Sequence, residues 1–131
     1  MIKKLIIFII ILAIGGVVFM PEVTSFSAKK AFKTENIDKP WAPKTVYKAA
    51  KINLRFWRYR TARTLLEKGI DTFPSEDWVD DAHYQIALCY EKIGDSTKAV
   101  EWYELFTQKY PDHEWLGQAK KRITNIQANM Q

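Results

Sequence analysis

Apolar and polar residues follow two different patterns along this chain, and the first covers its beginning. From Leu5 to Met20 sixteen consecutive residues carry no charged or polar side chain, and Lys3 and Lys4 precede them. A helix of this length spans about 24 Å, slightly less than the ~30 Å hydrocarbon core of a bilayer. A helix that is apolar on every face does not suit the surface of a water-soluble domain. We therefore expect residues 1–20 to form a signal anchor or transmembrane helix.

A cleaved signal peptide is the alternative for this segment. Such peptides combine a basic head, an apolar run and a cleavage site between small residues, and Ser25-Phe26-Ser27 before Ala28 fits that site. Either interpretation places the rest of the chain outside the cytosol if the basic head stays inside. Lys29, Lys30 and Lys33 beyond the apolar run weaken that charge asymmetry. The sequence leaves retention and cleavage both open.

Residues 21–43 show no sustained helical or strand period and contain Pro21, Pro40 and Pro43. Proline cannot continue a helical hydrogen-bond ladder, and the residue before it prefers extended backbone. We expect this stretch to be a linker between the apolar segment and a folded domain.

From residue 44 onward the second pattern is a repeat. The chain matches itself at an offset of 37 residues, and periods of 20–50 residues indicate stacked structural repeats. Within the unit, apolar residues from Val79 to Tyr90 recur at three- and four-residue spacings, as on one face of a helix. The matching pairs include Ala62 and Ala99, Phe73 and Tyr110, Pro74 and Pro111, Trp78 and Trp115, and Ala82 and Ala119. The pattern predicts an all-α solenoid.

The unit that begins at Asp80 resembles a tetratricopeptide repeat (TPR). The resemblance lies in Ile86, Ala87, Tyr90, Gly94-Asp95, Ala99, Tyr103 and Pro111. Small residues allow close helix packing, glycine accepts a left-handed helix end, and Asp95 can cap the next helix. The resemblance implies a short TPR solenoid of about 2.5 repeats in residues 44–131, with five antiparallel helices behind the N-terminal transmembrane helix.

Residues 43–76 form a degenerate copy of the repeat at 80–113. Asn53 replaces an aromatic residue there, and Trp57-Arg58 replaces Gly-Asp. A polar helix at about 114–129 suits a cap for the solenoid. The predicted packing residues are Ala50, Ala62, Pro74, Ala87, Tyr90, Gly94, Ala99, Tyr103 and Pro111.

The joint from Phe73 to Ala82 is similar to those of exported bacterial TPR proteins, among them the outer-membrane assembly lipoproteins and the Tol-Pal coordinator. No Cys follows the apolar run to carry a lipid, because the single Cys is Cys89. The resemblance implies an adaptor in a cell-envelope complex, either an assembly factor or a small accessory subunit. We expect a single-pass protein of the bacterial inner membrane, with a cytoplasmic N-terminus and a periplasmic TPR domain.

TPR domains bind peptides or proteins on a concave face formed by the first helix of each repeat. The resemblance implies that Tyr47 and Tyr84 contact a partner chain and that Lys51 and Arg55 bind its acidic side chains. The full set of predicted partner-binding residues is Tyr47, Lys48, Lys51, Arg55, Asp81, Tyr84, Gln85, Leu88, Lys92, Lys121 and Arg122, with Lys44 and Gln118 beside them.

Catalytic and metal-binding patterns are weak in this chain. His83 and Cys89 lie six residues apart and point to different faces of one helix, so they do not form a nucleophile–base pair. Neither His83 nor His113 has the helical partner that a metal site needs, and Asp77, Asp80 and Asp81 are typical of a helix N-terminus. We expect no enzyme activity, no metal and no cofactor.

Charge is distributed unevenly. Residues 28–68 contain twelve Lys or Arg and three acidic residues, whereas residues 69–117 contain three Lys and eleven acidic residues. The basic part favours contact with anionic lipid next to the membrane. The alternative is a nucleic-acid-binding or cytosolic TPR adaptor that uses the basic and aromatic residues of segment 55–60.

Overall fold

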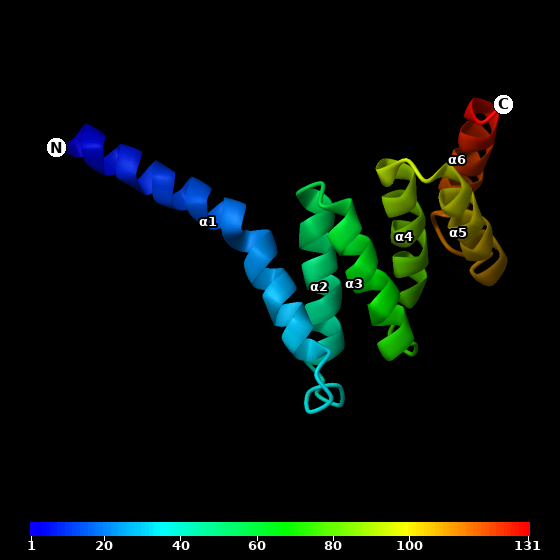
Figure 1. Cartoon of the computed structure of the whole chain (residues 1–131), viewed down its shortest axis with the longest axis horizontal. Helices are drawn as coiled ribbons and strands as arrows, with labels where there is room; N and C mark the ends of the chain where they lie inside the picture. Colours follow the sequence, from blue (N-terminus) through cyan, green and yellow to red (C-terminus); the bar gives the residue numbers. More distant parts are fainter.

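The computed structural model describes all 131 residues and contains six helices and no strands (Figure 1). Each helix packs against the next one in the chain, and α2 to α6 stand in a row from which α1 projects. The all-α fold class, a helical solenoid behind one apolar N-terminal helix, is therefore confirmed. The helices are α1 (Ile2–Ala31), α2 (Ala42–Arg55), α3 (Tyr59–Thr72), α4 (Val79–Ile93), α5 (Ser96–Lys109) and α6 (Leu116–Asn129).

Helix α1 is longer than expected. The linker predicted for residues 21–43 is wrong for residues 21–31, which continue the helix, and for residues 42–43, which begin α2, so only residues 32–41 form turns. Pro21 lies inside α1, where it removes one backbone donor but has a φ angle that a helix accepts. The hydroxyl of Ser25 donates to the Pro21 carbonyl at 2.6 Å. Proline spacing alone therefore placed the end of the helix too early.

The two faces of α1 differ beyond Met20. Pro21, Ser25 and Ala28 are buried at three- and four-residue spacings where α1 packs against α2. On the other side Val23 is 62% exposed and Phe26 is 72% exposed. These two residues carry exposed apolar surface beyond Met20, where Glu22 and Thr24 interrupt the apolar run. By length and composition α1 is the one helix suited to cross a membrane.

Two polar contacts join α1 to the solenoid. The buried Asn53 side chain donates from Nδ2 to Ser25 Oγ at 3.0 Å and to the Ala49 carbonyl at 2.8 Å. Arg58 Nη2 lies 2.7 Å from Glu22 Oε1. Asn53 and Arg58 are two of the positions at which the first repeat departs from the TPR pattern. Both departures serve the contact with α1.

Positions 57 and 94 correspond to each other in the two repeats and share an unusual backbone. Gly94 ends α4 with φ +94°, and the Asp95 carboxylate then accepts the Lys98 N–H at 3.1 Å, as the sequence predicts. Trp57 occupies the same place after α2 with φ +56°, and it is the one non-glycine residue with positive φ. This conformation is unfavourable for a residue with a bulky side chain.

The core consists of small residues on facing helices and a few large ones between them. Tyr103, Phe106 and Leu66 are fully buried. Gly69 in the first repeat corresponds to Phe106 in the second. The ring of Trp78 fills the space that a side chain at position 69 would occupy. A Cβ on Gly69 would lie 3.1 Å from the Trp78 ring, so only glycine fits comfortably. The predicted packing residues Ala50, Ala62, Ala87 and Ala99 are all buried, whereas Pro74 and Pro111 are exposed beyond the helix ends.

Candidate partner-binding groove

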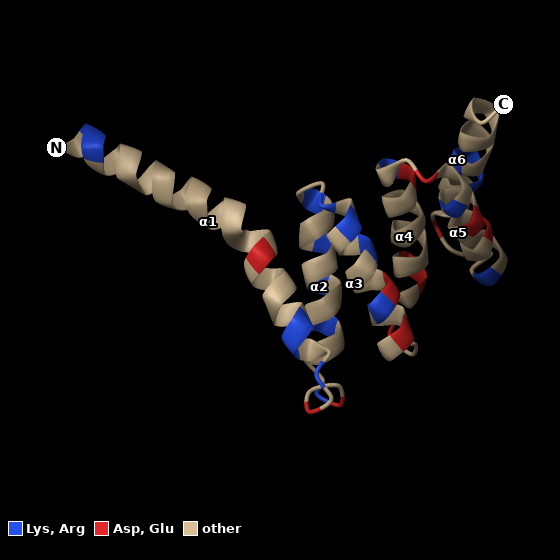
Figure 2. Ribbon diagram, viewed as in Figure 1, with Lys and Arg blue, Asp and Glu red and all other residues tan.

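A groove of about 550 Å³ lies between α2 and the start of α4. Its α2 wall is basic and its α4 wall is acidic. Figure 2 shows Lys and Arg along α2 and the first part of α3, and acidic residues on the later part of α3 and on α4. Helical spacing brings residues 44, 48 and 51 of α2 to one face. The lining residues are Lys44, Tyr47, Lys48, Lys51, Asp77, Trp78 and Asp81.

An aromatic pair lies between the charged walls. The rings of Tyr47 and Trp78 stack with centroids 5.0 Å apart and an interplanar angle of 8°. Tyr47 Oη donates to Asp81 Oδ2 at 3.1 Å and accepts a hydrogen bond from Gln85 Nε2 at 3.1 Å. Burial, with a further contribution from Asp81, raises the pKa of Tyr47 to about 12. Tyr47 is therefore a neutral, fixed hydroxyl, and Lys51 Nζ lies 5.4 Å from its ring centroid.

The same arrangement recurs 37 residues later. Tyr84 corresponds to Tyr47, and its ring packs against Trp115 with centroids 5.0 Å apart, although the two rings are tilted by 52° and not stacked. Tyr84 Oη donates to Gln118 Oε1 at 3.4 Å and accepts from Arg122 Nε at 3.0 Å. Trp115, Gln118 and Arg122 correspond to Trp78, Asp81 and Gln85. The tyrosine, its two polar partners and its tryptophan thus form one repeated joint between successive units.

The second joint is closed where the first is open. Tyr84 is only 6% exposed because Tyr103, Phe106 and Trp115 surround its ring. Where Lys48 and Lys51 stand in the first joint, the second has Gln85 and Leu88. The second joint therefore has no basic wall.

Arg122 belongs to a network between α4, α5 and α6. Its Nη1 donates to both Glu91 oxygens at 2.9 Å, and Tyr103 Oη donates to Glu91 Oε2 at 2.8 Å. Partial burial opposes the charge of Arg122, but its neighbours Tyr103, Tyr84 and Glu91 raise its pKa overall. Burial and Glu91 also raise the pKa of Tyr103. This network ties the capping helix to the second repeat.

The predicted partner-binding residues fall into three groups. Tyr47, Lys48, Lys51 and Asp81 lie together in the groove, with Lys44. Tyr84 and Gln85 are buried, and Arg122 is engaged with Glu91, so the expectation that all three face a partner differs from the structure. The remaining residues lie elsewhere: Arg55 is exposed at the end of α2, Leu88 is half-buried, Lys92 lines a hollow beside Trp57, and Lys121 lines one beside Arg122.

Asp77 and Trp78 complete the groove, although their sequence pattern indicates only a helix start and a repeated position. The repeat could have indicated that Trp78 belongs to the groove, because Trp78 corresponds to Trp115. A tryptophan kept at both joints next to the period-related tyrosines Tyr47 and Tyr84 indicates a repeated aromatic contact. The position of Asp77 depends on the loop before α4, and the sequence pattern did not specify that loop.

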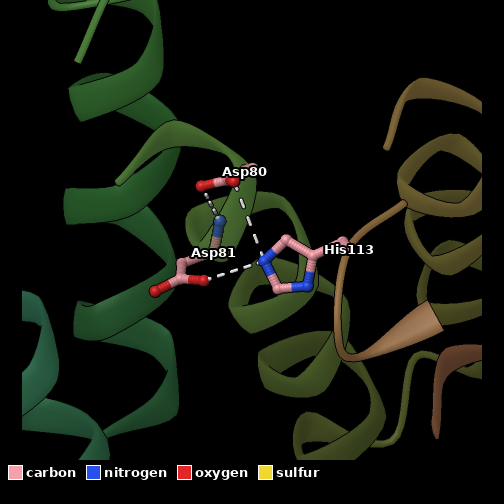
Figure 3. A group of neighbouring side chains, drawn as sticks. All are labelled: Asp80, Asp81 and His113. Carbon is pink, nitrogen blue, oxygen red and sulfur yellow. Dashed lines mark hydrogen bonds and ion pairs between the residues drawn. The ribbon is translucent and has the colours of Figure 1, made fainter. Parts of the chain in front are cut away.

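His113 lies against the acidic start of α4 (Figure 3). Its Nε2 is 3.0 Å from Asp81 Oδ1 and 3.8 Å from Asp80 Oδ2, and these donor atoms cluster closely enough to hold a metal ion. The Trp115 N–H donates to His113 Nδ1 at 3.1 Å, so the neutral ring carries its proton on Nε2 and donates it to Asp81. These hydrogen bonds account for the cluster as a structural link between the two units.

The two residues considered for catalysis are both buried in α4. Burial raises the pKa of the Cys89 thiol to about 12, which leaves it protonated and unreactive. Burial also lowers the pKa of His83, whose Nδ1 donates to the Val79 carbonyl at 2.7 Å. Their side chains form part of the packing between α4 and its neighbours.

The row of paired helices, the joint that recurs after 37 residues and the glycine-ended α4 define a TPR-like helical solenoid. A comparison with protein families agrees with this class: the profile of the YfiO family, described as an outer membrane lipoprotein, matches residues 40–120. The chain belongs to this family. The matched part comprises α2 to α5 and the start of α6, and α1 lies before it. A comparison with curated proteins finds no match.

Proposed function

We propose that this protein is a membrane-anchored TPR adaptor of the cell envelope, an assembly factor or small accessory subunit that binds another protein and catalyses no reaction. The observation that carries this proposal is the groove between α2 and α4, which has charged walls and an aromatic floor. The description of the family as an outer membrane lipoprotein supports an envelope location. No cofactor is needed for this function.

The groove suits a segment of a partner polypeptide. Its volume of about 550 Å³ accommodates a few side chains, not a whole domain. Lys48 and Lys51 would bind acidic side chains on one side of the segment, and Asp77 would bind a basic one on the other. The stacked rings of Tyr47 and Trp78 would contact apolar atoms between them. Two oppositely charged walls favour one direction of the bound chain.

Helix α1 is proposed as the membrane anchor, with its N-terminus in the cytoplasm and the solenoid outside the inner membrane. Its packing against α2 supports retention over cleavage. Removal of residues 1–27 would cut α1 just before Ala28 and would take away Glu22 and Ser25, which bond to Arg58 and Asn53. The one Cys is buried in α4, so attachment by α1 is proposed in place of a lipid.

Retention of α1 predicts a full-length protein in membranes. We expect the purified protein to have the mass of the whole chain, 15.3 kDa, and to stay in the membrane fraction after an alkaline carbonate wash. Intact-mass spectrometry and the wash test this. A soluble protein that begins at Ala28 would show cleavage and would contradict the anchor. A labelling reagent that does not cross the membrane should modify a Cys introduced at exposed Lys98 from the extracytoplasmic side only.

The groove predicts a specific loss of partner binding. We expect Lys48→Glu combined with Lys51→Glu to weaken co-purification of a crosslinked partner from detergent-solubilised envelopes at least about tenfold, because both changes reverse charge on one wall. The double variant Lys98→Glu and Lys109→Glu is the matched control, since it makes the same change in net charge on α5 outside the groove. Equal partner recovery from both variants would contradict a role for the groove.

A further inference from the structure

The turn between α2 and α3 is a basic surface with one large exposed aromatic residue. Trp57 is 76% exposed, and Arg55 and Arg60 beside it are exposed as well. We propose that this turn docks onto the anionic phospholipid surface of the membrane, with Trp57 in the headgroup layer. This inference rests on the proposed role of α1 as a membrane anchor and adds a second, lipid-binding surface to it.

The position of the turn follows from the ion pair between Arg58 and Glu22. Arg58 Nη2 lies 2.7 Å from Glu22 Oε1, so the turn is held against α1 at the level of residue 22. Glu22 follows Met20, the last residue of the apolar run, by about 3 Å along the helix. The headgroup layer on each side of a bilayer is roughly 5–8 Å thick. A membrane crossed by α1 therefore meets this turn at its surface.

The backbone of Trp57 is unfavourable for the fold itself. Its φ of +56° lies in the left-handed region that Gly94 occupies at the corresponding place in the second repeat. Glycine adopts this conformation freely, whereas the Cβ of any other residue comes too close to the following carbonyl oxygen. Burial of the Trp57 ring in the solenoid does not offset this close contact, because the ring is exposed. Tryptophan is enriched at the membrane–water interface, which is a reason to hold it here.

Next to Trp57 is a basic hollow that fits a phosphate headgroup. It has a volume of about 420 Å³ and includes Arg60 and Lys92 together with Arg58, which is paired with Glu22, and no acidic residue lines it. Lys92 comes from the end of α4, so the basic surface extends across two repeats. Each Lys or Arg close to an anionic membrane surface contributes about 1 kcal/mol to binding.

A single-stranded nucleic acid could also bind basic and aromatic side chains. The structure favours lipid because the Glu22–Arg58 ion pair places the turn beside the end of the apolar run of α1. On a membrane-anchored chain, an anionic bilayer surface is then always adjacent to the turn. Nucleic acid is an outcome that the experiment below distinguishes.

The test uses the full chain in vesicles of phosphatidylcholine and phosphatidylglycerol that carry brominated acyl chains, which quench nearby tryptophan fluorescence. Docking predicts a quenched component that disappears in Trp57→Phe and Trp57→Gly. It persists in Trp41→Phe, a matched control because Trp41 is exposed at the opposite end of α2. The glycine variant relieves the left-handed backbone, so its thermal midpoint should equal or exceed that of the wild type.

Charge dependence provides the second measurement. We expect Arg60→Glu to lower the docking equilibrium constant at least about fivefold, because it removes one positive charge from the surface and adds a negative one. Vesicles without phosphatidylglycerol should reduce the docked fraction as well. Quenching that is the same in Trp57→Phe, or equal in neutral and anionic vesicles, would overturn the proposal. Loss of the quenched component on addition of an oligonucleotide at physiological salt would assign the surface to nucleic acid instead. A chain removed from vesicles by carbonate would refute the anchor itself, whereas a retained but unquenched chain refutes docking alone.

Discussion

Replacing Phe106 with Ala is expected to destabilise the solenoid by about 3–5 kcal/mol, because it removes a fully buried aromatic ring and leaves a cavity. The ring packs against three aromatic rings of the same repeat: its centroid is 5.5 Å from that of Tyr84, 5.8 Å from that of Tyr110 and 5.0 Å from that of His113. Relaxation of the surroundings is limited, since these three rings are held by hydrogen bonds to other residues. Urea unfolding of the full chain in a mild detergent, followed by circular dichroism, measures the change.

Leu105→Ala is the matched control for this prediction. Leu105 is the preceding residue on α5 and is 40% exposed, so its truncation should change the free energy of unfolding by less than about 0.5 kcal/mol. A Phe106→Ala protein within about 1 kcal/mol of the wild type would show that this ring does not stabilise the second repeat.

Loss of the Arg122 guanidinium is expected to have the second largest effect. Arg122→Met keeps an apolar side chain of similar length but removes the bonds to Glu91 and Tyr84 and leaves the Glu91 carboxylate half-buried without its cation. Hydrogen bonds to charged groups contribute about 1.5–3 kcal/mol each, and partial exposure favours the lower end. We expect a loss of about 2 kcal/mol in the same unfolding experiment.

A double-mutant cycle separates the interaction from the individual residues. Glu91→Gln should also destabilise, and the Arg122→Met and Glu91→Gln double variant should lose at least about 1 kcal/mol less than the sum of the two. Lys121→Met is the control, because Lys121 is the adjacent exposed residue of α6. Additive effects would mean that Arg122 acts through packing and not through Glu91.

The sequence predicted the solenoid well where one residue determines the local backbone. Gly94 specified the left-handed end of α4 and Asp95 the cap of α5, and both follow from backbone sterics and hydrogen bonding over a few residues. The linker prediction was wrong for residues 21–31 because tertiary contacts override local tendency. Packing of Ser25 and Ala28 against α2 stabilises a helix that Pro21 alone would discourage.

The candidate groove was predictable only in part. The TPR resemblance placed Lys48 and Lys51 on the partner-binding face of α2, and the structure brings them together with Asp81. The same resemblance placed Tyr84 and Arg122 on the equivalent face, yet these two are occupied by partners within the chain. A family resemblance identifies a face, but whether a residue on it is free depends on residues that approach from other helices.

The sequence by itself determined the class of this protein: an apolar helix, a 37-residue repeat, and the positions of the small and turn residues that stacked helices require. These are local or periodic properties, so they can be read without knowing what packs against what. The tertiary structure decided three things: that α1 continues into the solenoid, that the first joint is open while the second is closed, and that Arg58 in the turn after α2 is paired with Glu22, just beyond the apolar run. Each depends on contacts between residues more than twenty positions apart. The local sequence pattern does not show which of these contacts form or how much free energy they contribute.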